Sequence, residues 1–466
     1  MGALLLGLAL RLAPIADDPL HPDECLYASW ALAIADGSDP WLRLAALDKP
    51  PLYPYLLAGW SKVVGPGPVA LRMLGIASAL AGLMAFSAAS KRLYGPAPAL
   101  AGLVMMALSP AAVALDGTAL TDQPAIALAL AALLASLRGS GVAAGLLFGL
   151  ALATKPQLLA FLPLILAALI SRRRQWREAA LGVAVVASLV LSYELVRQAP
   201  AGFADMALRN YGRDSSASSL PWLAREWLAV LRWSWADPRA MAFWATVCLG
   251  GLVTVLLNSV TSMAIGDSVA TGAALSLLLY LGANVVLGAP AWDRYTLVAV
   301  PLLAMLFAWA VARISASLRR GYGLLASAIL ALAMATLLLR PAQEAAFGRL
   351  PVGDTSRWQG IETVAAYLRG QVPGRATLLY QEFGWHLRYY ARGFTQDLRW
   401  FRDDAQLLAE AERAEPGYVL LPADAGGRRQ LALLREAGFS IETVLTAYRH
   451  DGSPSMYLLR LAGRPV

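Results

Sequence analysis

A pair of adjacent carboxylates, Asp23 and Glu24, directly follows the first apolar segment of the chain, in the stretch that runs from His21 to Tyr27. Carboxylates are costly in so apolar a setting unless water or a ligand reaches them, so the pair marks a candidate active site. Asp23 has the chemistry of a general base, while Glu24 would hold an acceptor or orient Asp23. The alternative is that both acids cap a helix that starts near Leu26.

Cations and a third carboxylate stand at the ends of other apolar segments. Lys49 precedes a proline pair, where it would grip a phosphate as a point charge or simply extend to the membrane interface. Arg294 precedes Tyr295 at the start of a late segment, and its planar fork suits two phosphate oxygens. Asp122 opens another segment, where helix capping explains it as well as function does.

The sequence gives little indication of a metal centre. The three histidines are scattered without ligand spacing, so a bound zinc is not expected. Asp23 and Glu24, together with Asp122, offer oxygen ligands to a divalent cation, and this alternative stays open. No other cofactor is expected.

The composition indicates which scaffold carries these residues. Of the 466 residues, 58% are hydrophobic and 15% are charged, and the mean hydropathy is +0.54. Repeated apolar segments predict a polytopic α-helical membrane protein, because only helices satisfy all their own backbone groups within one lipid-embedded segment. About eleven transmembrane helices are expected, near residues 3–16, 67–90, 97–115, 118–137, 141–154, 156–171, 178–196, 240–257, 269–288, 295–313 and 322–340.

Basic residues between these segments predict an orientation. With a cytoplasmic N-terminus, Lys91, Arg138 and the run from Arg172 to Arg174 fall on the cytoplasmic side, although the turn 258–267 has no basic residue. The candidate site then faces outward, which predicts a multi-pass protein of the cytoplasmic membrane with an extracytoplasmic active site. The net charge of +8 reflects this topology and contact with membrane lipids, not nucleic acid.

The composition changes after residue 340. Residues 1–340 form the predicted transmembrane domain, with external amphipathic loop helices at Tyr27–Leu32 and Trp222–Trp227. Residues 341–466 have mixed charge and predict an extracytoplasmic soluble α/β domain. Its expected helices cover residues 358–369, 404–412 and 428–437, and its expected strands cover residues 376–380, 418–421, 443–448 and 456–461.

Four motifs together resemble the polyprenyl-phosphate-dependent membrane glycosyltransferases of the C superfamily (GT-C), in particular glycosyltransferase family 39, with the protein O-mannosyltransferases and the lipid A aminoarabinose transferase. The motifs are Pro22-Asp23-Glu24-x-x-Tyr27, Lys49-Pro50-Pro51, Leu120-Thr121-Asp122 and Arg294-Tyr295. The resemblance covers roughly the first 340 residues. The chain departs from the aminoarabinose transferase at Leu26, where that enzyme carries an arginine.

The resemblance implies roles for these residues. Asp23 would be the catalytic base, and Lys49 and Arg294 would bind the lipid phosphate. The other substrate-binding residues would be Glu24, Tyr27, Asp122 and Tyr295. The enzyme would transfer a sugar from a polyprenyl-phosphate carrier to a lipid, glycan or protein acceptor, with inversion at the sugar carbon.

Two other classes of function fit parts of the sequence. A transporter or lipid flippase also carries charged groups in membrane helices, but transporters often show related halves, and no repeat is visible here. A scaffold that binds a partner through its tail would tolerate substitution of Asp23 and Lys49.

Overall fold

The computed structural model describes residues 2–16, 18–169, 173–211, 220–234, 238–257, 264–318, 320–349, 356–414 and 417–462. These form two compact units. The helical unit comprises Met1–Ile15 and Ala31–Gly353, and the C-terminal unit comprises Ala16–Trp30 and Asp354–Val466. The short segment 16–30, which contains the acidic pair, therefore clusters with the C-terminal residues.

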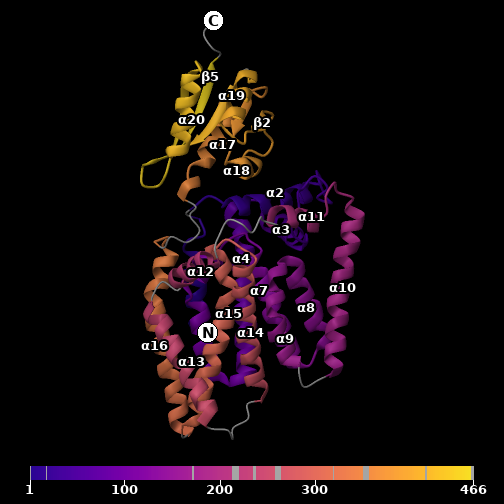
Figure 1. The fold of residues 1–466 in the computed structure, drawn as a ribbon, viewed down its shortest axis with the longest axis vertical. Helices are drawn as coiled ribbons and strands as arrows, with labels where there is room; N and C mark the ends of the chain where they lie inside the picture. The colour runs from indigo at the N-terminus through magenta and orange to yellow at the C-terminus, as the bar shows by residue number, and fades with distance from the viewer. Residues whose placement is uncertain are drawn as a thin grey trace. The chain divides into compact units, whose positions relative to one another are not determined.

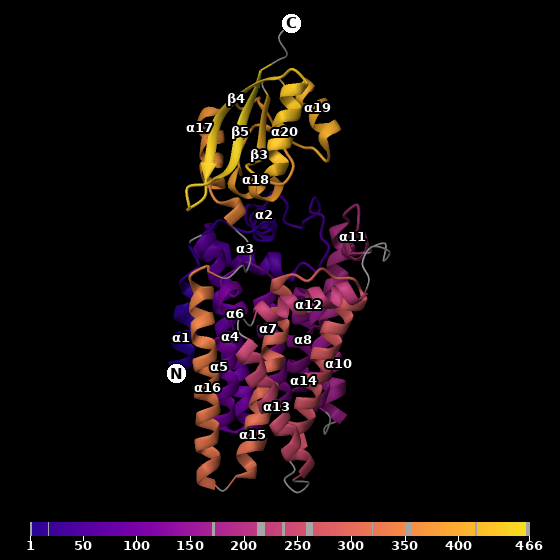
Figure 2. The same cartoon turned by 60° about the vertical axis from the view of Figure 1, so that its left-hand side comes forward.

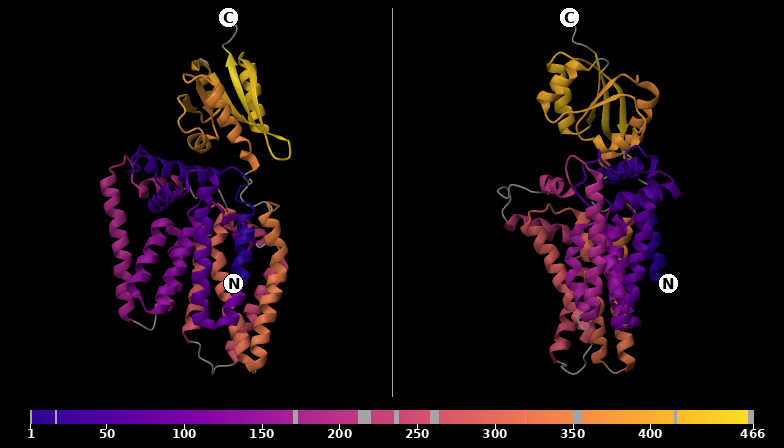
Figure 3. Two further views of the ribbon diagram at one scale, coloured as in Figure 1. Left: turned by 180° about the vertical axis from the view of Figure 1, so that it is seen from behind. Right: turned by 90° about the vertical axis from the view of Figure 1, so that its right-hand side faces the viewer.

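The helical unit consists of helices that run side by side (Figures 1 and 3). Its elements are α1 (Gly2–Leu12), α3 (Leu52–Val64), α4 (Pro68–Tyr94), α5 (Pro96–Ala107), α6 (Pro110–Leu115), α7 (Asp122–Arg138), α8 (Gly141–Thr154), η1 (Pro156–Phe161), α9 (Leu162–Leu169), α10 (Arg173–Arg197), α11 (Phe203–Tyr211), α12 (Leu220–Ser234), α13 (Pro238–Leu257), α14 (Ala264–Val286), η2 (Asp293–Val298), α15 (Ala299–Ser317) and α16 (Arg320–Ala346). The helix α2 (Pro22–Asp36) continues from one unit into the other.

Helices are found at every segment that the sequence predicts as a span. In the described ranges, six helices are long and apolar enough to cross a membrane, and four shorter ones are also apolar. The count of about eleven spans stays a prediction. Arg172 and the turn residues 258–263 lie outside the described ranges. The predicted domain boundary at residue 340 falls within α16, which continues to Ala346.

Short helices gather at one end of the helical unit. The helices α3, α11 and α12 lie at the upper end of the bundle in Figures 1 and 2. The predicted loop helix at Trp222–Trp227 is part of α12, and Trp227 is buried while Trp222 is exposed. One face of α12 therefore packs against the unit and the other remains open, as an amphipathic helix requires.

Small residues set the distance between α8 and α10. A Cβ atom on Gly145 of α8 would overlap the carbonyl oxygen of Ala179 on α10. A Cβ on Gly182 of α10 would lie 2.6 Å from the carbonyl oxygen of Val142. Reciprocal glycines let the two backbones approach closely, which is how helices associate in lipid without a hydrophobic driving force.

The C-terminal unit has a five-stranded sheet with helices on both faces (Figure 2). Its strand order is β2-β1-β3-β5-β4; β2, β1 and β3 are parallel, and β5 is antiparallel to both β3 and β4. The strands are β1 (Thr377–Tyr380), β2 (Asp397–Trp400), β3 (Gly417–Pro422), β4 (Ser440–Tyr448) and β5 (Pro454–Ala462). The helices are η3 (Ser356–Trp358), α17 (Ile361–Gln371), α18 (Gly384–Tyr390), α19 (Asp404–Arg413) and α20 (Ala425–Glu436).

Alternate strand residues build two separate cores. Leu378 of β1 packs with α17 and α18 on one face, and Leu379 packs with α19 and α20 on the other. All four residues of β1 and all six of β3 are buried, as parallel strands covered on both faces require. Three helices and four strands of this unit were predicted from the sequence, whereas α18 and the short edge strand β2 were not.

A test of the helical unit concerns the contact of α8 with α10. The substitution Gly145→Ala places a methyl group against the Ala179 carbonyl and should lower the free energy of unfolding by about 1–3 kcal/mol through overpacking. The control is Gly282→Ala on α14, where the added Cβ would meet no atom within 4 Å. Thermal unfolding midpoints in detergent compare the two variants, and equal midpoints would contradict the close approach of α8 and α10.

Candidate functional site

A buried ion pair joins two helix ends of the helical unit. Asp122 lies in the first turn of α7, and its carboxylate accepts a hydrogen bond from the ammonium group of Lys155. Lys155 lies between α8 and η1 in an extended conformation, because Pro156 cannot continue the helix. Both side chains are almost completely buried. The pair thus holds two charges inside the protein at breaks between helices.

Two further residues predicted from the sequence lie beside this pair. The Lys155 Nζ atom is 5.0 Å from the ring centre of Tyr295, and the Arg294 guanidinium is 5.4 Å from the same ring. The Arg294 guanidinium also lies 4.8 Å from the ring centre of Trp292. Arg294 and Tyr295 belong to the short helix η2, which starts at Asp293 and directly precedes α15. The aromatic ring of Tyr295 therefore lies close to two cations, Lys155 and Arg294.

Lys49 joins the same group. Its charge interacts electrostatically with both Lys155 and Tyr295, and its ammonium lies 3.0 Å from the carboxylate of Asp48. Arg294 and Lys49 both repel the ammonium of Lys155. We call Lys49, Asp122, Lys155, Arg294 and Tyr295 the cation cluster. Three cations this close repel one another, and an anionic ligand would add to the relief that Asp48 and Asp122 give.

A polar network supports the start of α7 from behind. The guanidinium of Arg11 lies 2.6 Å from the carboxylate of Asp116 and donates to the backbone carbonyls of Gly7 and Ala107 at 2.9 and 2.7 Å. Asp116 also accepts a hydrogen bond from Gln123, which directly follows Asp122. Arg11 is fully buried, so this network fixes α1 and the first turn of α7 together.

The acidic pair stands at the start of α2. This helix begins at Pro22, not near Leu26 as expected, because proline suits the first helical position. The Glu24 carboxylate is buried and accepts from the backbone N–H of His21 at 2.8 Å, which is a capping contact. Tyr27 is buried with its ring 5.8 Å from that of Trp30. The capping alternative therefore describes Glu24, and it leaves the role of Asp23 as a prediction.

The C-terminal unit holds the segment before Asp23 through both polar backbone atoms of Leu20. The Tyr390 hydroxyl accepts from the Leu20 N–H at 2.9 Å, and the His386 imidazole lies with Nε2 2.9 Å from the Leu20 carbonyl oxygen. Burial lowers the pKa of His386 to about 4, so the ring is neutral at physiological pH and its Nε2–H donates. The His386 ring stacks on Trp358 at 4.6 Å, and Trp385 meets Trp30 edge to face.

The predicted site residues thus fall into two sets. Lys49, Asp122, Arg294 and Tyr295 are grouped in the helical unit, and Asp23, Glu24 and Tyr27 lie in the C-terminal unit. The convergence of all of them on one chamber stays a prediction. Lys155, which falls between the predicted spans 141–154 and 156–171, was not among the predicted site residues. Nothing in the sequence pairs Leu20 with His386, which is 366 residues away.

Metal ligands are not grouped in the parts of the chain that the structure describes. There, no three or more His, Cys, Asp or Glu side chains come together in a way that would hold an ion. The divalent cation considered for Asp23, Glu24 and Asp122 has no support from this geometry and stays untested.

The chain was compared with family models, curated proteins and solved structures. A family model described as dolichyl-phosphate-mannose-protein mannosyltransferase matches residues 48–195, which include Lys49, Asp122 and Lys155. No curated protein matches the chain in sequence. Solved structures of the same architecture cover nearly the whole chain.

ArnT from Cupriavidus metallidurans is similar in both of its states. The apo structure has a TM-score of 0.68 at 15% identity and covers 98% of this chain and 97% of its own. The structure bound to undecaprenyl phosphate has a TM-score of 0.65 at 15% identity, over 98% and 96%. The Archaeoglobus fulgidus oligosaccharyltransferase tethered with an acceptor peptide has a TM-score of 0.57 at 11% identity, over 98% and 73%.

The chain therefore has the fold of the GT-C glycosyltransferases. It is a polytopic α-helical membrane protein with a C-terminal α/β domain, and the fold class and the superfamily resemblance predicted from the sequence are confirmed.

A test of the Leu20 contacts uses a cysteine inside the same segment. Cys25 is fully buried, and its thiol lies 3.7 Å from the Leu20 carbonyl oxygen. Replacing His386 by alanine removes the donor to that carbonyl and should raise the rate at which a maleimide labels Cys25 several-fold. The background is Cys248→Ala, which leaves Cys25 as the single thiol.

The matched control is Tyr448→Phe, an exposed position on β4. It should leave the labelling rate unchanged. If His386→Ala labels no faster than this control, the imidazole does not hold the segment.

Proposed function

We propose that this protein is a membrane glycosyltransferase that takes a sugar from a polyprenyl-phosphate carrier and transfers it to an extracytoplasmic acceptor. The observation that carries the proposal is the cation cluster, where Lys155 and Arg294 lie against the ring of Tyr295 beside a buried carboxylate, and the charge of Lys49 acts on Lys155 and Tyr295. A phosphate monoester is an anion that this group suits, since Arg and Lys donate charge-assisted hydrogen bonds to phosphate oxygens.

The comparisons support the same ligand. ArnT, which shares the fold, has been solved bound to undecaprenyl phosphate, and the matched family model is named for a dolichyl-phosphate-linked mannose donor. The acceptor is a lipid, glycan or protein, and the archaeal neighbour was solved with an acceptor peptide. The basic turns of the sequence favour a cytoplasmic membrane location with the site on the outer side.

In the proposed reaction Asp23 acts as the general base. An acceptor hydroxyl or amine attacks the sugar carbon opposite the phosphate, and Asp23 takes the proton that this nucleophile loses. The bond between the sugar carbon and the phosphate oxygen breaks, and its electron pair leaves with the polyprenyl phosphate. Lys49, Lys155 and Arg294 stabilise the charge that develops on that leaving oxygen, and the sugar carbon is inverted.

The remaining residues support this step. Glu24 fixes the first turn of α2 through its contact with His21, and thereby the backbone that carries Asp23. Asp122 orients Lys155 through their ion pair, and Tyr295 offers an aromatic face to the surrounding cations. Tyr27 contributes to substrate binding from the same helix as Asp23.

The proposal is tested by the substitution Asp23→Asn in full-length protein reconstituted in liposomes with a polyprenyl-phosphate sugar and an acceptor extract. The rate of sugar transfer should fall by about 10²–10⁴-fold, because the amide cannot accept the proton. The control is Asp36→Asn at the end of the same helix, where the exposed carboxylate accepts from the backbone N–H and the hydroxyl of Ser38.

Sugar-linked lipid that crosses the bilayer without loss of its sugar would indicate a flippase instead. Full transfer by the Asp23→Asn variant would contradict the assignment of the base.

A further inference from the structure

The sheet of the C-terminal unit contains a topological switch point. From β1 the chain passes through α18 on one face of the sheet to β2, and from β2 it returns through α19 on the other face to β3. The connection that leaves β1 runs toward β2, whereas the connection that leaves its neighbour β3 runs through α20 toward β4 at the opposite edge of the sheet. In sheets of this kind ligands bind in the crevice outside the carboxyl ends of the strands at the switch point.

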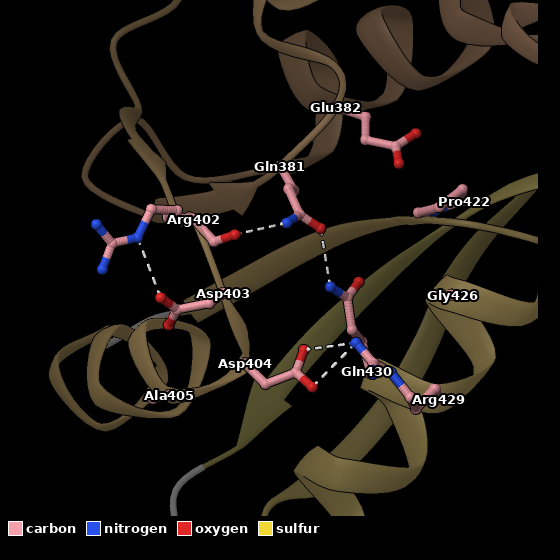
Figure 4. Close-up of a pocket in the computed structure, with 11 residues that line it drawn as sticks. Gln381, Glu382, Arg402, Asp403, Asp404, Ala405, Pro422, Gly426, Arg429 and Gln430 are labelled. Carbon is pink, nitrogen blue, oxygen red and sulfur yellow. Dashed lines mark hydrogen bonds and ion pairs between the residues drawn. The ribbon is translucent and has the colours of Figure 1, made fainter. Parts of the chain in front are cut away.

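A cavity opens at that place (Figure 4). Its volume is about 470 Å³, within the range of about 300–1,000 Å³ that is usual for small-ligand pockets. Its walls come from the loops that follow β1, β2 and β3 and from the starts of α19 and α20. The side chains with polar groups in the lining are Gln381, Glu382, Arg402, Asp403, Asp404, Arg429 and Gln430.

The loop between β3 and α20 is shaped to leave this space open. A Cβ atom on Gly427 would overlap the carbonyl oxygen of Pro422, so only glycine allows the helix to start so close to the strand. Asp424 caps the helix by accepting from the N–H of Gly427 at 3.0 Å. The wall of the cavity is therefore a fixed backbone turn.

The polar side chains of the lining are ordered by one another. Gln381 donates to the backbone carbonyl of Arg402 at 2.9 Å, and its own side-chain oxygen accepts from Gln430 at 2.9 Å (Figure 4). The guanidinium of Arg402 lies 3.1 Å from Asp403, and that of Arg429 lies 3.0 Å from Asp404. The hydrogen-bonded amides of Gln381 and Gln430 are preorganised for a ligand, whereas the arginine side chains are largely exposed and held more weakly.

We propose that this crevice binds a saccharide. Each of the two arginines of the lining already has a carboxylate beside it, and the carboxylates outnumber the arginines, which disfavours a phosphate or another anion. Amides, carboxylates and guanidinium groups within one cavity present donors and acceptors together. Sugar hydroxyls suit such a wall, because each of them donates one hydrogen bond and accepts others.

An aromatic ring stands beside the lining. Trp400, at the end of β2, donates its indole N–H to the backbone carbonyl of Gln381 at 3.1 Å, and about half of its surface is exposed. An exposed ring next to a polar cavity offers an apolar surface to the C–H face of a sugar while its N–H stays satisfied. This combination favours a saccharide over a small ion.

The inferred site is additional to the residues assigned to sugar transfer, since none of them lines the cavity. The choice of a saccharide rests in part on the proposed function, because an enzyme that moves sugars has a glycan acceptor or product to hold. The site itself rests on the geometry of the C-terminal unit.

The test is saturation-transfer NMR on the full-length protein in nanodiscs. The probes are methyl α-D-mannopyranoside and N,N′-diacetylchitobiose, with inorganic phosphate as a competitor. At least one sugar should bind saturably, and the double variant Asp404→Asn/Arg429→Gln should weaken that binding at least tenfold. The matched control is Glu410→Gln/Arg413→Gln, which removes an acid–arginine ion pair from α19 outside the cavity.

Three outcomes would overturn the inference: neither sugar binds, the cavity variant binds as tightly as the control, or phosphate displaces the sugar competitively. The variant Asp23→Asn separates this inference from the proposed function. This variant should bind the sugar like the wild type but fail in sugar transfer. Sugar binding and sugar transfer can therefore be tested independently.

Discussion

The ion pair between Asp122 and Lys155 is the interaction on which the helical unit's site depends. Two charges taken out of water lose several kcal/mol of hydration each, and only a close partner compensates for that loss. Here each partner ends or starts a helix, so the pair also fixes where α7, α8 and η1 meet. Removing either side chain would leave the other as an unpaired buried charge. The pair therefore stabilises the fold and also positions the Lys155 ammonium in the cation cluster.

Around this pair the protein keeps more positive charge than the pair itself needs. Lys49 and Arg294 come from separate loops, and both repel the ammonium of Lys155. The carboxylates of Asp48 and Asp122 offset part of this repulsion, and an anionic headgroup would offset more of it. The face of the Tyr295 ring also stabilises Lys155 and Arg294 through cation–π interactions.

The acidic segment is held by a different kind of interaction. Leu20 has an ordinary apolar side chain, but its backbone N–H and carbonyl are both bonded to side chains of α18. A neutral, buried imidazole is a suitable partner for a carbonyl, because it donates without bringing a charge into the core. The C-terminal α/β fold therefore orders the backbone three residues before Asp23.

The sequence predicted what depends on local pattern. Apolar length located the helices, and residue type at segment ends singled out Lys49, Asp122, Arg294 and Tyr295, which the structure groups together. It did not find Lys155 as a site residue, because a lysine before proline is equally a helix break. It missed β2, a four-residue edge strand with partly exposed residues, and α18, a single seven-residue helix rich in aromatics. The Leu20 contacts depend on long-range packing, which no local pattern encodes.

The most direct test of the account is the equilibrium affinity of the full-length protein in nanodiscs for undecaprenyl phosphate, compared with uncharged undecaprenol. The account predicts that the phosphate binds more tightly, and that Lys49→Met/Arg294→Gln weakens its binding by about tenfold or more, since each charged hydrogen bond contributes about 1.5–3 kcal/mol. The control Arg43→Gln/Lys62→Met, at exposed positions of the chain on either side of Lys49, should bind like the wild type. Equal affinity for the phosphate and the alcohol, or an unchanged affinity in the cluster variant, would contradict the claim that the cation cluster receives the lipid phosphate.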